Sequence, residues 1–192
     1  MIRRLLTVAV LVMAVSACSG GNGRPSELDG KKIANDARRP VAETYWHLYR
    51  SIGDAAFTTS ADGWFTRCAR SEQNLVRYTV VTVLDSRDRT GKRETEEELY
   101  AAVAARFASV GWHLSQGLHR SATKKNVTAE LSPPPFSGNV ATVQFQVSGK
   151  CMDVGAATDT LVNGSGSETD IYRNSKKGVG SVPTTFPKSA GQ

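Results

Sequence analysis

The sequence predicts an α+β fold, in which an antiparallel sheet of four to five strands carries two helices on one face as a two-layer sandwich. Two segments, residues 40–52 and 95–110, repeat apolar side chains every three or four positions, which is typical of amphipathic helices. Segments between and after them alternate apolar and polar side chains, which is the period of a strand. Runs of strands with helices between them favour this layered arrangement.

The first helix is expected to begin at Pro40, because proline suits the first position of a helix, and to end at Gly53. Trp46 and Tyr49 lie near the edge of its apolar stripe. They could contact lipid or polysaccharide, but packing against a sheet is the commoner use of such aromatic side chains. The stripe itself consists of Val41, Tyr45, Leu48 and Ile52.

Two strands are expected next, at residues 64–70 and 75–84. In the first, alternation places Cys68 on the same face as Trp64, and we expect that face to point toward the core. In the second, Arg77 and Thr79 fall on the face opposite the apolar side chains. Those apolar side chains are Val76, Tyr78, Val80 and Leu84.

The second helix has the clearest start signal in the chain. Thr95 and Glu98 have the spacing of a capping box, and the acidic residues 96–98 suit the positive end of a helix dipole. Gly111 is expected to end this helix. Its apolar stripe consists of Leu99, Val103, Phe107 and Val110.

The remaining strands are expected at residues 112–121 and 126–131, as a hairpin turning near Lys124 and Lys125, and at residues 139–150. The last segment alternates most strictly. Its apolar face, which also takes in Cys151, consists of Ala141, Val143, Phe145 and Val147. Its polar face, with Gln144 and Gln146, would lie on the side of the sheet away from the helices.

These patterns define one globular domain at residues 40–155. The preceding residues 18–39 begin with many Gly and Ser residues and predict a flexible tether. The residues that follow, 156–192, are rich in Gly, Ser and Thr and predict a mostly disordered tail, with room for one short strand near Ile171.

The N-terminus has the order of a secretory signal. Arg3 and Arg4 precede an apolar run at residues 5–17, which ends in the small residues Ser16 and Ala17 directly before Cys18. A helix of this length would cover roughly 20 Å, whereas a bilayer core is roughly 30 Å thick. The run therefore predicts a cleaved signal at residues 1–17 and not a permanent membrane span.

The sequence Val15-Ser16-Ala17-Cys18 resembles the lipobox of bacterial lipoproteins. The resemblance implies that residues 1–17 are removed and that the Cys18 thiol carries a diacylglycerol, with two or three acyl chains in total. A single acyl chain anchors a protein only marginally, so several chains make the attachment durable. The protein would then sit on the extracytoplasmic face of the cell membrane. In outline the chain is also similar to small lipoproteins of high-GC Gram-positive bacteria, a loose likeness that carries no functional residues.

Three cysteines are present, and lipidation of Cys18 would leave Cys68 and Cys151. Two remaining cysteines in an exported chain most simply form a disulfide, which would here close a loop of about 80 residues. Two separate buried thiols are the alternative that the sequence leaves open.

No catalytic, metal or cofactor site is predicted from the motifs. His47, His113 and His119 have no metal-binding spacing, and the Gly-Ser fragments of residues 164–181 lack the strand–turn–helix setting of a serine nucleophile. The net charge of +6 falls to +4 without the two arginines of the signal. Such a balance could favour anionic lipid or wall polymers, although solvated surface charge explains it more simply. Motifs for nucleic-acid binding are absent from the sequence, so no nucleic-acid partner is expected.

The sequence therefore leaves three functional hypotheses. The first is a non-enzymatic lipoprotein that binds an envelope protein or a wall polymer while its lipid holds the membrane. The alternative is a small hydrolase acting on wall or lipid substrates, which would need a histidine and a carboxylate within hydrogen-bond reach in a cleft. The third is a lipid carrier, which would need an apolar cavity.

Overall fold

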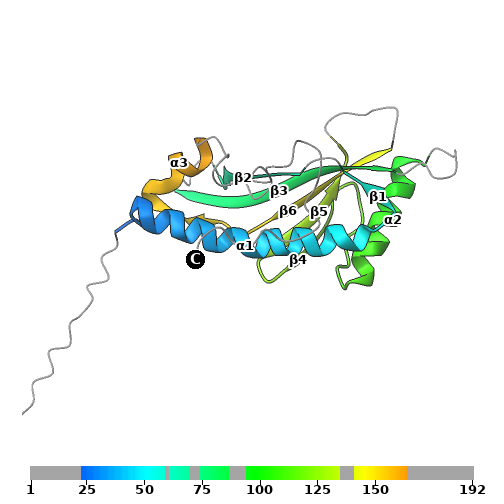
Figure 1. Cartoon of the computed structure of the whole chain (residues 1–192), viewed down its shortest axis with the longest axis horizontal. Helices are drawn as coiled ribbons and strands as arrows, with labels where there is room; N and C mark the ends of the chain where they lie inside the picture. Colours follow the sequence, from blue (N-terminus) through cyan, green and yellow to red (C-terminus); the bar gives the residue numbers. More distant parts are fainter. Residues whose placement is uncertain (1–22, 59–60, 70–73, 87–93, 135–140, 164–192) are drawn as a thin grey trace, which may run out of the picture.

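The computed structural model describes residues 23–58, 61–69, 74–86, 94–134 and 141–163 (Figure 1). The expected signal, the lipobox and the expected strand near Ile171 lie outside these residues. The elements in chain order are α1 (Glu27–Ile52), β1 (Ala56–Phe57), β2 (Asp62–Arg67), β3 (Leu75–Ser86), α2 (Glu96–Ser109), β4 (Arg120–Lys124), β5 (Val127–Ser132), β6 (Thr142–Ser148), β7 (Met152–Asp153), the 3-10 turn η1 (Gly155–Ala157) and α3 (Thr158–Asn163).

The strands form one antiparallel sheet, which confirms the predicted α+β class. β3 pairs with β1 and β2 along one edge and with β6 and β7 along the other, and β5 and β4 follow β6. The described residues form seven strands, where four or five were expected, because β1 and β2 share one edge of β3 while β6 and β7 share the other. The order across the sheet is β1 and β2, then β3, then β6 and β7, then β5 and finally β4.

The core lies between the sheet and the two long helices. The ring of Phe145 on β6 lies 5.2 Å from that of Tyr45 on α1 and 5.0 Å from that of Phe107 on α2. One sheet residue therefore contacts both helices, which places α1 and α2 on the same face. Trp46 is only 1% exposed and meets Tyr45 edge to face at 5.4 Å, so this aromatic side chain packs in the core.

Helix α1 begins at Glu27, so the expected start at Pro40 is wrong. Ser26 caps the helix, because its hydroxyl accepts a hydrogen bond from the Asp29 amide at 3.2 Å. Pro40 lies inside the helix, where it cannot donate to the Asp36 carbonyl. Both residues are exposed, so water can satisfy that carbonyl. Residues 27–39 belong to the domain and not to a flexible tether.

The domain also extends beyond its expected C-terminal boundary at residue 155, because η1 and α3 continue the described chain to residue 163. This segment packs against the start of α1. The Ala156 amide donates to the Pro25 carbonyl at 3.2 Å, and the Thr160 hydroxyl donates to Glu27 at 3.4 Å. The start of α1 and the β7–η1–α3 segment cover each other, which is why the sequence pattern of either one alone predicted disorder.

The side chains of β2 face the opposite sides of the sheet from those we expected. Phe65 is 2% exposed and meets the Tyr78 ring at 5.0 Å, whereas Trp64 is 40% exposed. Two adjacent aromatic residues gave the strand an apolar side chain on either face, so alternation could not decide between them. Cys68, which shares the face of Trp64, is half-buried and Cys151 is exposed, so neither cysteine faces the core.

The second half of the chain follows the predictions more closely. The capping box of Thr95 and Glu98 is present at the start of α2. The hairpin between β4 and β5 turns at Lys125 and Asn126, both with positive φ, one residue later than expected. The expected strand at residues 112–121 is wrong for most of its length, because residues 113–119 form a loop and β4 begins only at Arg120.

The contact between α1 and the C-terminal segment can be tested at Gly30. A Cβ at this position would lie 2.1 Å from the Val154 carbonyl oxygen. In an exposed helix, Gly→Ala stabilises by up to about 1 kcal/mol. Here we expect Gly30→Ala to lower the free energy of unfolding by about 1–3 kcal/mol, because the close packing cannot admit the methyl group.

Urea denaturation measures this change. Gly23→Ala is the matched control, since a Cβ at Gly23 meets nothing within 4 Å. A Gly30→Ala protein as stable as the parent would contradict the packing of α1 on β7 and η1.

Candidate functional site

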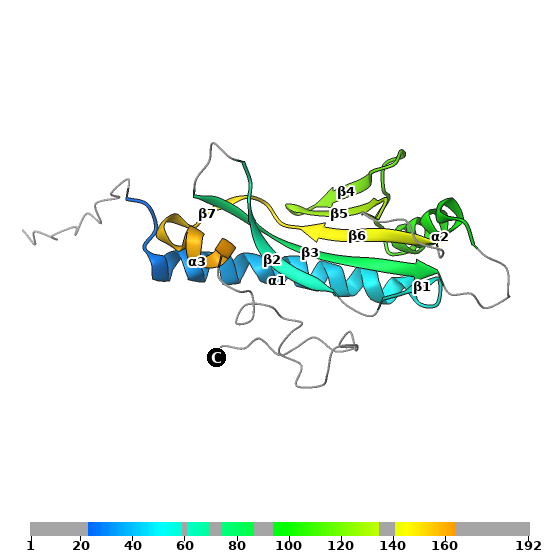
Figure 2. The ribbon, with the colours of Figure 1, turned by 90° about the horizontal axis from the view of Figure 1, so that it is seen from above.

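All helices that the structure describes lie on one face of the sheet. α1 and α2 share it through Phe145, and α3 joins them through an ion pair between Arg67 and Asp159 at 2.5 Å. Arg67 alternates with Thr66 and so points to the same side as the buried Phe65. Figures 1 and 2 show α1 running along the length of the sheet, with α3 beside its first turns and α2 at its other end. The opposite face carries no helix of the described chain.

We call this opposite surface the outer face. Strand register gives its rows directly: Trp64 lies beside Thr79, which lies beside Ser148. Trp64 and Val83 are exposed by 40% and 39%. By this register the outer face includes Phe57, Asp62, Trp64, Thr66, Arg77, Thr79, Val81, Val83, Asp85, Thr128, Glu130, Ser132, Thr142, Gln144, Gln146 and Ser148.

The outer face offers hydrogen-bond donors and acceptors mainly through the partly exposed amides of Gln144 and Gln146, because the hydroxyl residues Thr79 and Ser148 are only 5% and 7% exposed. Trp64 lies at one side of this face, and Phe57 shares the face through its register with Asp85. The charges of this face are mixed, with Arg77 and Glu130 both contributing. Such a surface is suited to holding an extended partner more than to enclosing a small substrate.

The disulfide lies on this outer face. Cys68 follows β2 and Cys151 precedes β7, and their Cα atoms are 6.1 Å apart. Because β2 and β7 pair with opposite edges of β3, the bridge crosses over the beginning of β3. It therefore ties β2 to β7 across the beginning of β3.

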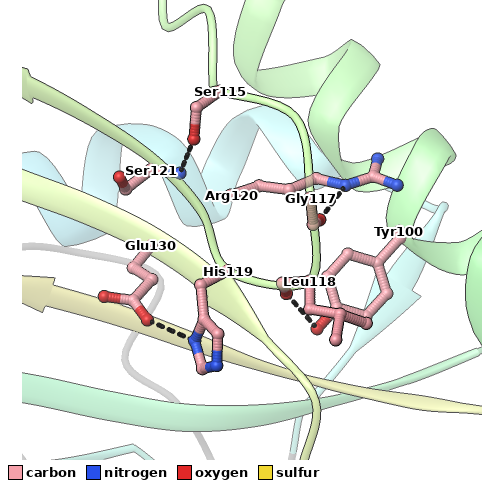
Figure 3. Close-up of polar contacts among 8 residues, drawn as sticks. All are labelled: Tyr100, Ser115, Gly117, Leu118, His119, Arg120, Ser121 and Glu130. Carbon is pink, nitrogen blue, oxygen red and sulfur yellow. Dashed lines mark hydrogen bonds and ion pairs between the residues drawn. The ribbon is translucent and has the colours of Figure 1, made fainter.

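One histidine and one carboxylate do meet on the outer face. His119 Nδ1 lies 3.0 Å from Glu130 Oε1, just before β4 (Figure 3). The hydrolase hypothesis requires such a pair in a cleft. The His119 side chain is 70% exposed, and the pair stands on open surface.

A cavity of about 380 Å³ lies on the inner-face side of β4, opposite the His119–Glu130 pair. It is bounded by α2 and the loop of residues 113–119, and its lining consists of Ala104, Leu114, Ser115, Gln116, Gly117 and Arg120. Arg120 is its one charged lining residue. The guanidinium lies 5.2 Å from the centre of the Tyr100 ring, and its Nε donates to the Gly117 carbonyl at 3.2 Å.

The loop around this cavity is held by hydrogen bonds to β4. The Ser115 amide donates to the Ser121 carbonyl at 2.9 Å, and the Ser115 hydroxyl accepts from the Ser121 amide at 3.0 Å (Figure 3). Burial raises the pKa of Tyr100 to about 12, which keeps its phenol neutral near pH 7 and able to donate to the Leu118 carbonyl. A small anion could bind Arg120, but no base or nucleophile is aligned there.

The alternation of side-chain direction at the start of β4 places the His119–Glu130 pair and the cavity on opposite faces of the sheet. His119 and Arg120 are adjacent, so they point to opposite faces of the sheet. The histidine–carboxylate pair and the cavity therefore do not combine into one site. Sequence reasoning missed both, because each depends on the register between β4 and β5.

The other candidate residues stay apart. His47 lies on α1, His113 in the loop after α2 and His119 next to β4. In the described ranges no three metal-binding side chains come together. The acidic residues 96–98 form the first turn of α2, as the capping-box interpretation predicted.

No family model matches the chain, and searches of curated proteins and of solved structures found no match either. Across the described residues no helix, the long α1 included, is apolar enough over a sufficient length to span a membrane.

The disulfide predicts a large stability difference. Replacing both Cys68 and Cys151 with serine removes a cross-link between residues separated by 83 positions, and we expect the free energy of unfolding to fall by about 2–5 kcal/mol. Urea denaturation of the parent and of the double variant measures this. Thiol labelling of the denatured, unreduced parent should find both cysteines blocked, and quantitative labelling of either would contradict the bridge.

Proposed function

We propose that this chain is a lipid-anchored protein of the bacterial cell envelope, which binds a partner through the outer face and performs no chemistry on it. The observation that carries the proposal is the one-sided covering of the sheet. The described helices all lie on the inner face, and the outer face keeps Trp64, Arg77 and Val83 exposed, with Gln144 and Gln146 partly exposed beside them.

Export and anchoring rest on two independent features. The lipobox-like Val15-Ser16-Ala17-Cys18 supports cleavage of residues 1–17 and lipidation of Cys18. The disulfide between Cys68 and Cys151 supports an oxidising compartment, because disulfides persist outside the cytosol and are rare within it. Both agree with a location on the extracytoplasmic face of the cell membrane.

A wall polysaccharide is the partner class that the outer face fits best. Sugars present apolar C–H faces beside hydroxyl groups, so an exposed aromatic ring next to hydroxyl and amide side chains can contact both at once. Trp64 is 40% exposed, and Gln146 in the adjacent row is partly exposed, whereas Thr79 and Ser148 beside Trp64 are only 5% and 7% exposed. The ring and the amide therefore carry the expected contact. The mixed charge of the surface favours a polymer that is not strongly anionic.

A hydrolase is the second candidate, and the 3.0 Å contact between His119 and Glu130 is the observation in its favour. This pair could act on a polymer lying across the outer face only if a third group supplied or oriented a nucleophile. The binding proposal needs no such additional group.

Anchoring predicts a clear effect of Cys18→Ala. Without the thiol that receives the lipid, the protein should leave the detergent-extractable membrane fraction and lose palmitate labelling, because the acyl chains are its proposed attachment to the bilayer. Fractionation with palmitate labelling measures both. Normal membrane retention of the Cys18→Ala protein would contradict lipid anchoring.

Polysaccharide binding predicts a role for Trp64. We expect Trp64→Ala to weaken binding to isolated peptidoglycan sacculi by about tenfold, which is typical of removing a central aromatic contact. The matched control is Leu118→Ala, because Leu118 is 75% exposed but lies in the loop near α2. Co-sedimentation with sacculi measures the change.

Equal binding by the parent and the Trp64→Ala protein would remove Trp64 from the contact surface. A parent protein that ignores sacculi but crosslinks through Trp64 to an envelope protein would overturn the polysaccharide assignment. Release of soluble sugar fragments by the parent, lost in His119→Ala, would favour the hydrolase.

A further inference from the structure

We propose that the first turns of α1 rest on the bilayer that holds Cys18, with Leu28 in the membrane interface and the α2 end pointing away. This inference rests on the lipid anchor of the proposed function and adds an orientation to it. Three observations carry it: the length of chain after Cys18, the fixed start of α1, and the side chains exposed there.

The connection between the anchor and the domain is short. Four residues separate Cys18 from Gly23, the first described residue, and even a fully extended chain of that length reaches only about 17 Å. The headgroup layer of one leaflet is about 5–8 Å thick. A helix beginning at Pro40 would have left a tether of 21 residues, whereas the observed start at Glu27 leaves little slack.

The residues before α1 add no slack either, because they are already part of the fold. The Pro25 carbonyl accepts a hydrogen bond from the Ala156 amide at 3.2 Å. The same carbonyl approaches Gly155 so closely that a Cβ on Gly155 would lie 2.2 Å from it. Pro25 is thus held against η1, and the start of α1 cannot move away from the anchor independently of the domain.

The surface next to the anchor has the composition of an interfacial contact. Leu28 is 78% exposed, and Lys32, one turn further on the same face, is exposed as well. Further along this face Asp36 is exposed and Arg39 pairs with Glu43 at 2.8 Å, so the cations that favour a bilayer are confined to the first turns, at Arg24 and Lys32. An apolar side chain flanked by cations is typical of helices that lie at a membrane surface.

The acidic side chains of this end are already engaged within the protein. Glu27 forms an ion pair with Lys31 at 2.7 Å, and Asp29 accepts a hydrogen bond from the Ser26 hydroxyl at 2.7 Å. They therefore repel lipid headgroups less than free carboxylates would, while Arg24 and Lys32 stay exposed.

The length of α1 sets the distance between the end of the domain near Cys18 and the end that carries α2. Its 26 residues span about 39 Å at 1.5 Å per residue. Just beyond its last turn, Asp54 pairs with Arg106 on α2 at 3.2 Å. Figures 1 and 2 accordingly place α3 at the anchored end and α2 at the opposite end. The cavity around Arg120, next to α2, would then face away from the bilayer.

The chain offers a matched pair of positions to test this orientation. Leu28 and Leu118 are exposed by 78% and 75%, and Leu118 lies at the α2 end, where its carbonyl meets Tyr100. Full-length lipidated Leu28→Cys and Leu118→Cys proteins each carry one reactive thiol, because lipid and the disulfide block the native cysteines. Each is labelled with an environment-sensitive fluorophore and reconstituted in phosphatidylglycerol–phosphatidylcholine vesicles containing a lipid quencher at the headgroup boundary.

We expect the label at position 28 to lose at least half of its fluorescence to the quencher, and the label at position 118 to lose less than a tenth. A second variant, Lys32→Glu with Leu28→Cys, should reduce the quenching at position 28 at least twofold. Equal quenching at both positions, or none at position 28, overturns the orientation.

Mass spectrometry of the same preparations separates the two proposals. Acylated Cys18 without quenching at position 28 overturns the orientation alone and leaves the lipid anchor standing. Unmodified Cys18 in protein recovered from native membranes overturns the anchor and, with it, the orientation that depends on the short connection.

Discussion

The structure depends on burial of one face of its sheet against two helices. Phe145 stands at the centre of this contact, with Tyr45 from α1 on one side and Phe107 from α2 on the other. A sheet this small can bury its inner face fully only if both helices lie on that side. The outer face is left open as a direct consequence, so the same interaction that stabilises the fold also creates the surface available for binding.

Alternation along the strands then decides what the open surface can do. A histidine and a carboxylate meet there at 3.0 Å, but Arg120 and the cavity are turned to the inner side by a single step along the chain. A one-residue change of register in β4 would exchange His119 and Arg120 between the faces. The loop bonds between Ser115 and Ser121 hold the start of β4 and so stabilise the observed register.

The sequence predicted those features that depend on neighbouring residues. The capping box of Thr95 and Glu98 is a local interaction, and the strict alternation around Phe145 leaves one choice of face. The start of α1 could not be predicted in this way, because Gly30 and Ala34 are too small to register as an apolar stripe. Gly30 packs against Val154 and Ala157, more than a hundred positions away, and Ala34 is fully buried one turn further on. The same holds for His119 and Glu130, which meet only through the hairpin register.

That long-range contact also bears on the proposed lipid anchor at Cys18. A helix of this length would be marginal at its first turns if they stood alone in water, because helix ends fray without tertiary packing. The β7–η1–α3 segment supplies the packing, and the ordered chain therefore extends back to within a few residues of Cys18. Weakening that contact would fray the first turns of α1 without changing the outer face. If Cys18 carries the proposed lipid, the distance between the domain and the membrane would then depend on this contact inside the folded domain more than on the composition of the residues after Cys18.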